Sequence, residues 1–280
     1  MKFWMGRYAA LAITGLLTVT LVGCGAGTDT AGQADGAAQA CELNVFAAAS
    51  MQETLEQIAD QYEAENPGVA VLLNLDSSGT LKTQIEQGAD CDVFISAAQK
   101  QMDELDIAVD ADKNAHRLDF VDDATRVDLL ENQVVLVVPE GNPKNIQSFS
   151  DIASRSELIA LGNSDVPVGQ YSEEILRNLG LWDALNAAGK ITYGSNVKEV
   201  TTQVAEGVAD CGIVYATDAF SAGLTAVDEA TEDLCGQVIY PAAVMKHSAQ
   251  KEQATAFLEY LQTDAASEIF ESVGFHPLTE

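Results

Sequence analysis

Small hydroxyl and amide side chains occur at four points where a strand-like run passes directly into a helix-like run. They lie in the segments AAASMQE, LDSSGT, NSDVPVG and NVKE, which begin at Ala47, Leu75, Asn163 and Asn196. A helix N-terminus presents unpaired N–H groups and about half a positive charge, so it attracts anions. The chemistry these residues could perform is therefore the binding of a small anion by neutral hydrogen-bond donors.

The same residues could instead cap their own helices, as every α/β protein requires. Ser50, with Glu53 three residues later, has the spacing of a capping box. Capping is the simpler explanation of any one junction. Two junctions in each half of the chain make the two explanations about equal, and the pattern alone does not choose between them.

Motifs for other chemistry are missing from the sequence. It contains no G-x-S-x-G elbow, Walker loop or dinucleotide fingerprint, and its three histidines lack metal or triad spacing. Acidic pairs such as Asp103-Glu104 and Asp122-Asp123 lack the spacing of a calcium loop, which favours solvated faces. We predict a protein that is not an enzyme and has no cofactor.

Strand-like and helix-like segments alternate along most of the chain. The predicted strands are 43–47, 69–75, 93–96, 134–138, 158–162, 191–193, 212–215 and 238–245. The predicted helices are 51–62, 81–88, 171–180, 197–207, 251–262 and 265–273. This alternation indicates an α/β fold with two lobes, each a mostly parallel sheet flanked by helices. The chain crosses between lobes near 125–140 and again near 237–245, which predicts a hinge with a ligand cleft beyond the strand ends.

The N-terminal segment has the features of an export signal. Lys2 and Arg7 precede an apolar run, and L-V-G-C at 21–24 resembles the lipobox of bacterial lipoproteins. The apolar run is short for a membrane-spanning helix, which is the alternative. We therefore predict a signal peptide at 1–23, lipid attachment at Cys24 and a flexible tether at 24–40. The mature protein would lie outside the cytoplasm, anchored to the membrane at the cell surface or in the periplasm.

The formal net charge of the whole chain is −29. Nucleic acids and membrane surfaces are also anionic, so this charge argues against both as electrostatic partners. Solubility is its simplest explanation.

Four cysteines remain once Cys24 is assigned to lipid. An even number in an exported chain is typical of disulfides, whereas zinc would need a CxxC spacing that is absent. Cys41 and Cys91 each stand just before a predicted strand. Neighbouring parallel strands start at the same edge of a sheet, which favours the pairs Cys41–Cys91 and Cys211–Cys235.

Seven segments resemble, in order, the periplasmic molybdate-binding proteins. They are VFAAAS, SSGTL, DVFISA, NQVVLV, VPVGQY, GIVYATDA and FESVGF, which begin at Val45, Ser77, Asp92, Asn132, Val166, Gly212 and Phe270. The resemblance covers residues 42–276. It implies a type II periplasmic-binding-protein-like fold, with lobe 1 formed by 41–130 plus 240–280 and lobe 2 by 131–239. It also implies a monomer that passes molybdate or tungstate to an ABC transporter permease.

The resemblance also assigns ligand contacts by motif position. Ser50 and Ser78 would each donate a hydroxyl and a backbone N–H, Val168 and Val197 a backbone N–H, and Tyr215 its phenol. Molybdenum would enter only as the oxyanion held by these residues. Sulfate or another tetrahedral oxyanion is the alternative ligand.

Asp76 stands two residues before Ser78, where a carboxylate facing the cleft would oppose an anion. We expect it instead to cap the following helix or to face solvent.

Overall fold

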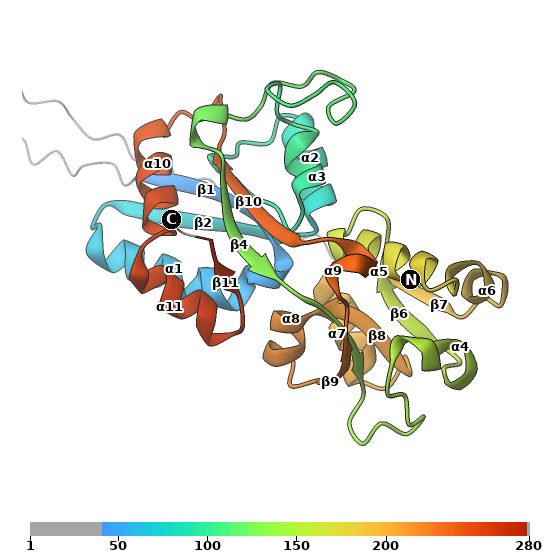
Figure 1. The fold of residues 1–280 in the computed structure, drawn as a ribbon. Helices are drawn as coiled ribbons and strands as arrows, with labels where there is room; N and C mark the ends of the chain where they lie inside the picture. Colours follow the sequence, from blue (N-terminus) through green and yellow to red (C-terminus); the bar gives the residue numbers. More distant parts are fainter. Residues whose placement is uncertain (1–40, 279–280) are drawn as a thin grey trace, which may run out of the picture. The chain divides into compact units, whose positions relative to one another are not determined.

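The computed structural model describes residues 41–278. The predicted signal peptide, Cys24 and the tether lie outside this range. Within it, strands and helices alternate along the chain and form two separate sheets (Figure 1). None of the helices in this range combines the length and the apolar character needed to cross a membrane.

The first lobe is built on a six-stranded sheet with strand order β11-β4-β10-β3-β1-β2. Its strands are β1 (Cys41–Ala48), β2 (Val69–Asp76), β3 (Val93–Ile95), β4 (Val127–Asn132), β10 (Val238–Val244) and β11 (His276–Pro277). Its helices are η1 (Ala49–Met51), α1 (Gln52–Glu65), α2 (Ser78–Glu86), α3 (Gln99–Asp103), η2 (Asp123–Thr125), α10 (Lys251–Tyr260) and α11 (Asp264–Ser272). Along β1, Leu43 and Val45 belong to one core cluster and Phe46 to another. Side chains alternate between the faces of a strand, so helices cover both faces of this sheet.

The second lobe is built on a five-stranded sheet with strand order β7-β6-β8-β5-β9. Its strands are β5 (Val134–Val138), β6 (Ile159–Gly162), β7 (Ile191–Gly194), β8 (Cys211–Tyr215) and β9 (Thr225–Glu229). Its helices are η3 (Phe149–Asp151), α4 (Ile152–Arg155), α5 (Pro167–Asn178), α6 (Trp182–Ala187), α7 (Val197–Ala205), α8 (Ala216–Ser221) and α9 (Glu232–Cys235). All five residues of β5 and of β8 are buried, as expected of central strands covered on both faces.

Both sheets are mixed, whereas the sequence predicted mostly parallel ones. β1 runs parallel to β2 and β3, and β6 runs parallel to β7 and β8. β10 pairs antiparallel with β3 and β4, and β5 pairs antiparallel with β8 and β9. β5 and β10 each begin directly after a crossing between the lobes and run opposite to the neighbouring parallel strands, and the short β11 near the C-terminus also pairs antiparallel with β4.

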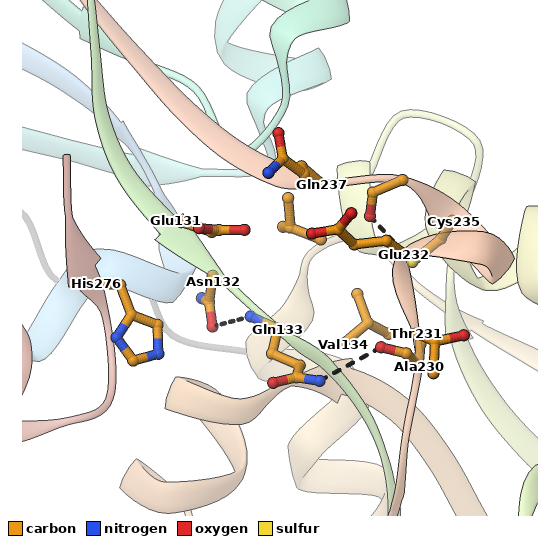
Figure 2. A pocket seen from close by; sticks show the side chains of 12 residues that line it. Glu131, Asn132, Gln133, Val134, Ala230, Thr231, Glu232, Cys235, Gln237 and His276 are labelled. Atoms are coloured by element: carbon orange, nitrogen blue, oxygen red, sulfur yellow. Dashed lines mark hydrogen bonds between the residues drawn. The ribbon is translucent and has the colours of Figure 1, made fainter.

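The chain passes between the sheets at two places. β4 ends at Asn132 and β5 begins at Val134, so only Gln133 separates the two sheets. The return runs from the end of β9 at Glu229 through α9 to Val238, the first residue of β10. The two crossings lie close together, because the Gln133 side-chain amide donates to the Ala230 carbonyl at 3.3 Å (Figure 2).

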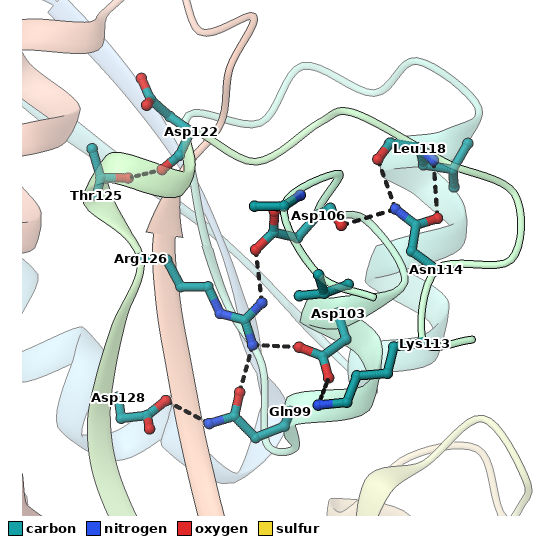
Figure 3. A network of polar contacts seen from close by, with 12 residues as sticks. Gln99, Asp103, Asp106, Lys113, Asn114, Leu118, Asp122, Thr125, Arg126 and Asp128 are labelled. Atoms are coloured by element: carbon teal, nitrogen blue, oxygen red, sulfur yellow. Dashed lines mark hydrogen bonds and ion pairs between the residues drawn. The ribbon is translucent and has the colours of Figure 1, made fainter. Parts of the chain in front are cut away.

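Arg126 holds together the segment between α3 and β4 (Figure 3). Its Nη2 lies 2.5 Å from Asp103 Oδ1 and 2.6 Å from Gln99 Oε1, and its Nη1 lies 2.8 Å from Asp106 Oδ2. Asp103 and Asp106 are both buried. The expectation that the Asp103-Glu104 pair forms a solvated face is therefore wrong for Asp103, which one guanidinium compensates inside the fold.

The predicted Cys41–Cys91 disulfide is wrong, because all four cysteines of the described range are free. Strand pairing sets Val45 opposite Val93, so Cys91 is level with Leu43 and not with Cys41. Cys91 also packs in the cluster on the opposite face of the sheet from Leu43 and Val45. By strand alternation Cys41 shares the face of those two residues, so the two thiols point away from each other.

The predicted Cys211–Cys235 disulfide is also wrong, because both cysteines are free. Cys211 begins β8, whereas Cys235 ends α9 and lines the pocket shown in Figure 2. Burial raises the pKa of the Cys211 thiol to about 12 and that of the Cys235 thiol to about 11, so both stay protonated.

Gly169 stands where the first turn of α5 packs against the end of β6. A Cβ at this position would lie 2.3 Å from the carbonyl oxygen of Gly162 and 2.4 Å from that of Asn163. Both atoms are backbone and cannot move aside as a side chain would. We expect Gly169→Ala to lower the free energy of unfolding by about 1–3 kcal/mol through overpacking, measured by urea denaturation.

A matched control for Gly169→Ala is Gly88→Ala, where a Cβ meets no atom within 4 Å but φ is +89°. Its cost would come from backbone conformation alone, about 1 kcal/mol. Because Gly169 has no positive φ, a Gly169→Ala variant as stable as the wild type would show that the close approach contributes nothing.

Candidate functional site

Residues of both lobes line one small cavity at the carboxyl ends of their strands. Ser50, Ser78 and Ala97 come from the first lobe, and Pro167, Val197 and Tyr215 from the second. The cavity volume is about 10 Å³, roughly what one water molecule needs. A tetrahedral oxyanion is larger than this volume.

Four of the five predicted ligand residues line this cavity: Ser50, Ser78, Val197 and Tyr215. Val168 does not line it. It is fully buried as the second residue of α5, and its neighbours Val166 and Pro167 form the wall instead. The predicted contact of Val168 was through its main chain, and the first N–H groups of a helix have no partner within that helix.

Ser50 does not cap a helix, contrary to the capping-box expectation. It lies inside η1, whose N-cap residue Ala48 makes no side-chain bond. The Ser50 hydroxyl is 3.0 Å from the Tyr240 hydroxyl, and Glu53 pairs with Lys198 of the other lobe. Neither Ser50 nor Glu53 therefore caps the start of its own helix in the way that the capping-box spacing had suggested.

The second and fourth junctions do carry helix caps. Ser77 accepts from the Thr80 N–H at the start of α2, and Asn196 accepts from the Glu199 N–H at the start of α7, each at 3.1 Å. Because Ser77 performs the capping, the next residue, Ser78, can face the cavity. Helix capping and lining of the cavity are thus divided between the adjacent residues Ser77 and Ser78.

The peptide of Ala97 connects the two lobes beside the cavity. Its N–H donates to the Ser78 hydroxyl at 2.9 Å, and its carbonyl accepts from the Tyr215 hydroxyl at 3.3 Å. Burial raises the pKa of the Tyr215 phenol well above its ordinary value. Tyr215 therefore keeps its proton and acts as a hydrogen-bond donor.

Asp76 lines the cavity, and the expectation that it caps α2 is wrong because Ser77 does so. Its Oδ1 accepts the Ser77 N–H at 2.7 Å and lies 3.5 Å from the amide nitrogen of Asn196 in the second lobe. It is the one charged residue among those that line the cavity. These two protein donors partly compensate the negative charge of the Asp76 carboxylate.

No lysine or arginine is among the residues that line the cavity. The nearest cation whose contacts link the lobes is Lys198, in the first turn of α7. Its Nζ is 2.8 Å from both carboxylate oxygens of Glu53 in α1, and 3.2 Å from Oδ1 of Asp218 in α8. Lys198 therefore links the two lobes through Glu53, and the one charged side chain in the cavity lining is Asp76.

Asp218 is fully buried, and neither of its oxygens accepts a well-oriented hydrogen bond within the described residues. Burial raises its pKa to about 6, although Lys198 opposes this shift. The charge of Asp218 depends on Lys198, a link that sequence spacing did not reveal.

Residues 43–276 match the family model described as bacterial extracellular solute-binding protein. The chain is 40% identical to a putative ABC transporter substrate-binding lipoprotein, YvgL, of Bacillus subtilis, over 83% of this chain and 85% of that protein. It is 36% identical to the molybdate-binding protein ModA of Escherichia coli, over 84% and 88% of the two chains.

Solved structures with the same fold include the periplasmic molybdate-binding protein of Azotobacter vinelandii. That likeness has a TM-score of 0.71 at 26% identity and covers 83% of this chain and 98% of the other. A sulfate-binding protein, SubI of Mycobacterium tuberculosis, has a TM-score of 0.70 at 18% identity and covers 85% and 87% of the two chains. At that identity the second likeness shows the fold alone.

Proposed function

Because the chain belongs to the bacterial extracellular solute-binding protein family, we propose that it captures molybdate or tungstate and delivers it to an ABC transporter. The observation that carries the proposal is the shared cavity. Hydroxyls of Ser50 and Ser78 from one lobe and of Tyr215 from the other surround it, without a basic side chain. Molybdate-binding relatives at 36% identity support the choice of ligand.

The proposed contacts are hydrogen bonds from the hydroxyl and the backbone N–H of both Ser50 and Ser78, from the hydroxyl of Tyr215, and from the main chain near Val168 and Val197. Hydrogen bonds to a charged partner contribute about 1.5–3 kcal/mol each. About seven such donors give roughly 10–20 kcal/mol before the costs of dehydration and lobe closure. A net of about 10–12 kcal/mol corresponds to sub-micromolar or nanomolar binding.

The strongly negative net charge, −29 for the whole chain, does not prevent this binding. Charges on the surface are screened beyond about 8–10 Å at ordinary salt, whereas the donors act at contact distance inside a closed cavity. We propose lobes of 41–130 plus 240–280 and of 131–239, which separate to admit the ion and close around it. The binding cycle needs no bond-making step, so we propose that the protein binds its ligand without turning it over.

We also propose that the mature protein begins at Cys24, carries lipid there and acts as a monomer at the outer face of the membrane. The name of the Bacillus subtilis relative, a lipoprotein, supports the anchor. Mass spectrometry of the membrane fraction would test it, because Cys24→Ala should abolish both lipid attachment and membrane retention.

Isothermal titration tests the ligand. We expect molybdate and tungstate to bind at micromolar protein with sub-micromolar Kd, and sulfate to compete only weakly. No heat with either oxyanion would refute the proposal, and tight sulfate binding with weak molybdate binding would favour the alternative ligand.

Tyr215→Phe is expected to weaken molybdate binding by about 1–3 kcal/mol, the cost of one lost hydrogen bond to a charged partner, because the proposed ligand would take the Tyr215 hydrogen that the Ala97 carbonyl accepts in its absence. The ring would still fill its buried place, so folding should be retained. Tyr193→Phe is the matched control, because Tyr193 belongs to the same lobe and is 48% exposed. Equal affinities of the two variants would remove Tyr215 from the site.

A further inference from the structure

Tyr240 lies directly behind Ser50, on the strand by which the chain returns to the first lobe. It is fully buried and is not among the residues that line the cavity. Its hydroxyl has two hydrogen-bond partners within the described residues: Ser50 Oγ at 3.0 Å and Asn132 Nδ2 at 3.2 Å. Its ring packs edge-on against Tyr215 and Phe275, so the hydroxyl is held in place.

The orientation of the Asn132 amide follows from its neighbour. The backbone N–H of Gln133 can only donate, and it lies 2.8 Å from Asn132 Oδ1 (Figure 2). The oxygen of the amide must therefore face Gln133, and the NH₂ group faces inward. That group donates one hydrogen to Tyr240 and the other to Thr217 Oγ1, at 2.9 Å.

The direction of the Tyr240–Ser50 bond is then set. The Tyr240 oxygen accepts from Asn132, and its own hydrogen points to Ser50 Oγ. If Ser50 donated instead, the buried Tyr240 hydrogen could turn only to the neighbouring Tyr215 hydroxyl, with which it makes no well-oriented hydrogen bond, and that is unfavourable. Burial raises the pKa of Tyr240 well above its ordinary value, so that hydrogen is always present.

The hydroxyl oxygen of Ser78 also accepts a hydrogen bond from the protein, but from a different donor. Its Oγ accepts the backbone N–H of Ala97 at 2.9 Å, and a peptide N–H cannot reverse its role. Both serines thus accept from the protein, which leaves their own hydrogens free to point into the cavity.

We propose that Tyr240 and Asn132 are positioning residues that fix Ser50 as a hydrogen-bond donor and so contribute to selectivity between oxyanions. A hydroxyl whose hydrogen is directed at the ligand, and whose oxygen already accepts from the protein, favours a fully deprotonated oxyanion. At the position of Ser50 it opposes a protonated oxyanion such as hydrogen phosphate, whose own O–H needs an acceptor; the carboxylate of Asp76 is the acceptor elsewhere in the lining. The inference rests on the proposed function, which it refines.

A double-mutant cycle between Ser50→Ala and Tyr240→Phe tests this proposal. We expect Tyr240→Phe to weaken molybdate binding three- to tenfold, while hydrogen phosphate binding at pH 8 stays constant or strengthens. In the Ser50→Ala background, Tyr240→Phe should change molybdate affinity less than twofold, because Tyr240 acts only through Ser50. Equal fold-losses in both backgrounds would overturn the proposal and assign Tyr240 to packing.

The control is Tyr62→Phe, a buried tyrosine of the first lobe that contacts Phe257 and Tyr260 through its ring. It should leave both affinities unchanged. Should wild-type protein bind neither molybdate nor tungstate, the proposed function fails and the selectivity proposal fails with it. Should wild-type protein bind while the cycle is additive, only the role of Tyr240 fails.

A neutron structure of the wild-type protein provides a test that needs no substitution and no ligand. The deuteron between Tyr240 and Ser50 should be bonded to the Tyr240 oxygen. A deuteron bonded to Ser50 Oγ on that line would overturn the proposal even if molybdate binds.

Discussion

Arg126→Met is expected to lower the free energy of unfolding by about 3–5 kcal/mol, the usual cost of removing one partner from a buried ion pair. Arg126 is the guanidinium between Asp103 and Asp106, whose side chains are only 9% and 3% exposed. Methionine preserves much of the apolar stem but leaves two carboxylates without their shared cation. Lys113 reaches Asp103 at 3.3 Å but is 58% exposed, so it replaces little of the lost interaction.

The measurement for Arg126→Met is urea denaturation followed by circular dichroism. Arg155→Met is the matched control, because Arg155 pairs with Asp151 on the surface and is 42% exposed. Exposed pairs are worth about 0–1 kcal/mol, so the control should remain near wild type. A loss for Arg126→Met no larger than that of the control would contradict the buried-pair interpretation.

The alternation of strands and helices in the described residues was largely predictable from local patterns. Continuous apolar runs such as 134–138 match the observed strand β5 to the residue. β4 was not predicted as a strand, because its sequence VDLLEN mixes acidic and apolar residues and only its place in the sheet decides its conformation. The antiparallel pairings were also missed, since strand direction depends on the crossings between lobes and not on local propensity.

The candidate site was predictable in part, because strand ends followed by helix starts converge in an α/β fold. From that geometry and the family resemblance, Ser50, Ser78, Val197 and Tyr215 were predicted to lie together. In the structure all four line one cavity. Tyr240 was missed because it is 190 residues from Ser50 and occupies an ordinary strand position. Contacts at such separation leave no local pattern in a single sequence.

The disulfide predictions failed on the same ground. Proximity of two strand starts was inferred correctly, but the face on which each thiol lies depends on register. A shift of one residue moves a side chain to the opposite face of the sheet. Cys41 and Cys91 show this, since they lie on neighbouring strands yet face different core clusters.

Lys198→Met is expected to destabilise the protein in a way that depends on pH. Asp218 is fully buried, and its compensating cation is the Nζ of Lys198 at 3.2 Å. Above pH 7 the variant would hold an unpaired buried carboxylate, which costs about 3–5 kcal/mol. The variant would also lose the interlobe contact with Glu53, so molybdate affinity should fall as well.

The sign of the pH dependence follows from the raised pKa of Asp218. That pKa is about 6 in the folded protein, against 3.8 as the ordinary value. The folded state therefore binds this proton more tightly than the unfolded state does. Its stabilising contribution is complete below pH 3.8 and is lost as pH rises through about 6. Without Lys198 the folded pKa rises further, so the deficit of the variant should be small below pH 5 and grow above pH 6.

Unfolding free energies of Lys198→Met between pH 5 and pH 8 test this expectation. Lys251→Met is the matched control, because Lys251 pairs with Asp122 and is 50% exposed. It removes the same charge from an acidic protein, yet should cost less than about 1 kcal/mol at every pH. Glu53→Gln separates the two roles of Lys198, since it breaks the interlobe contact but keeps the pair with Asp218. That variant should lose affinity without the pH-dependent loss of stability. A Lys198→Met deficit that is the same at pH 5 and pH 8 would show that Asp218 does not depend on Lys198 for its charge.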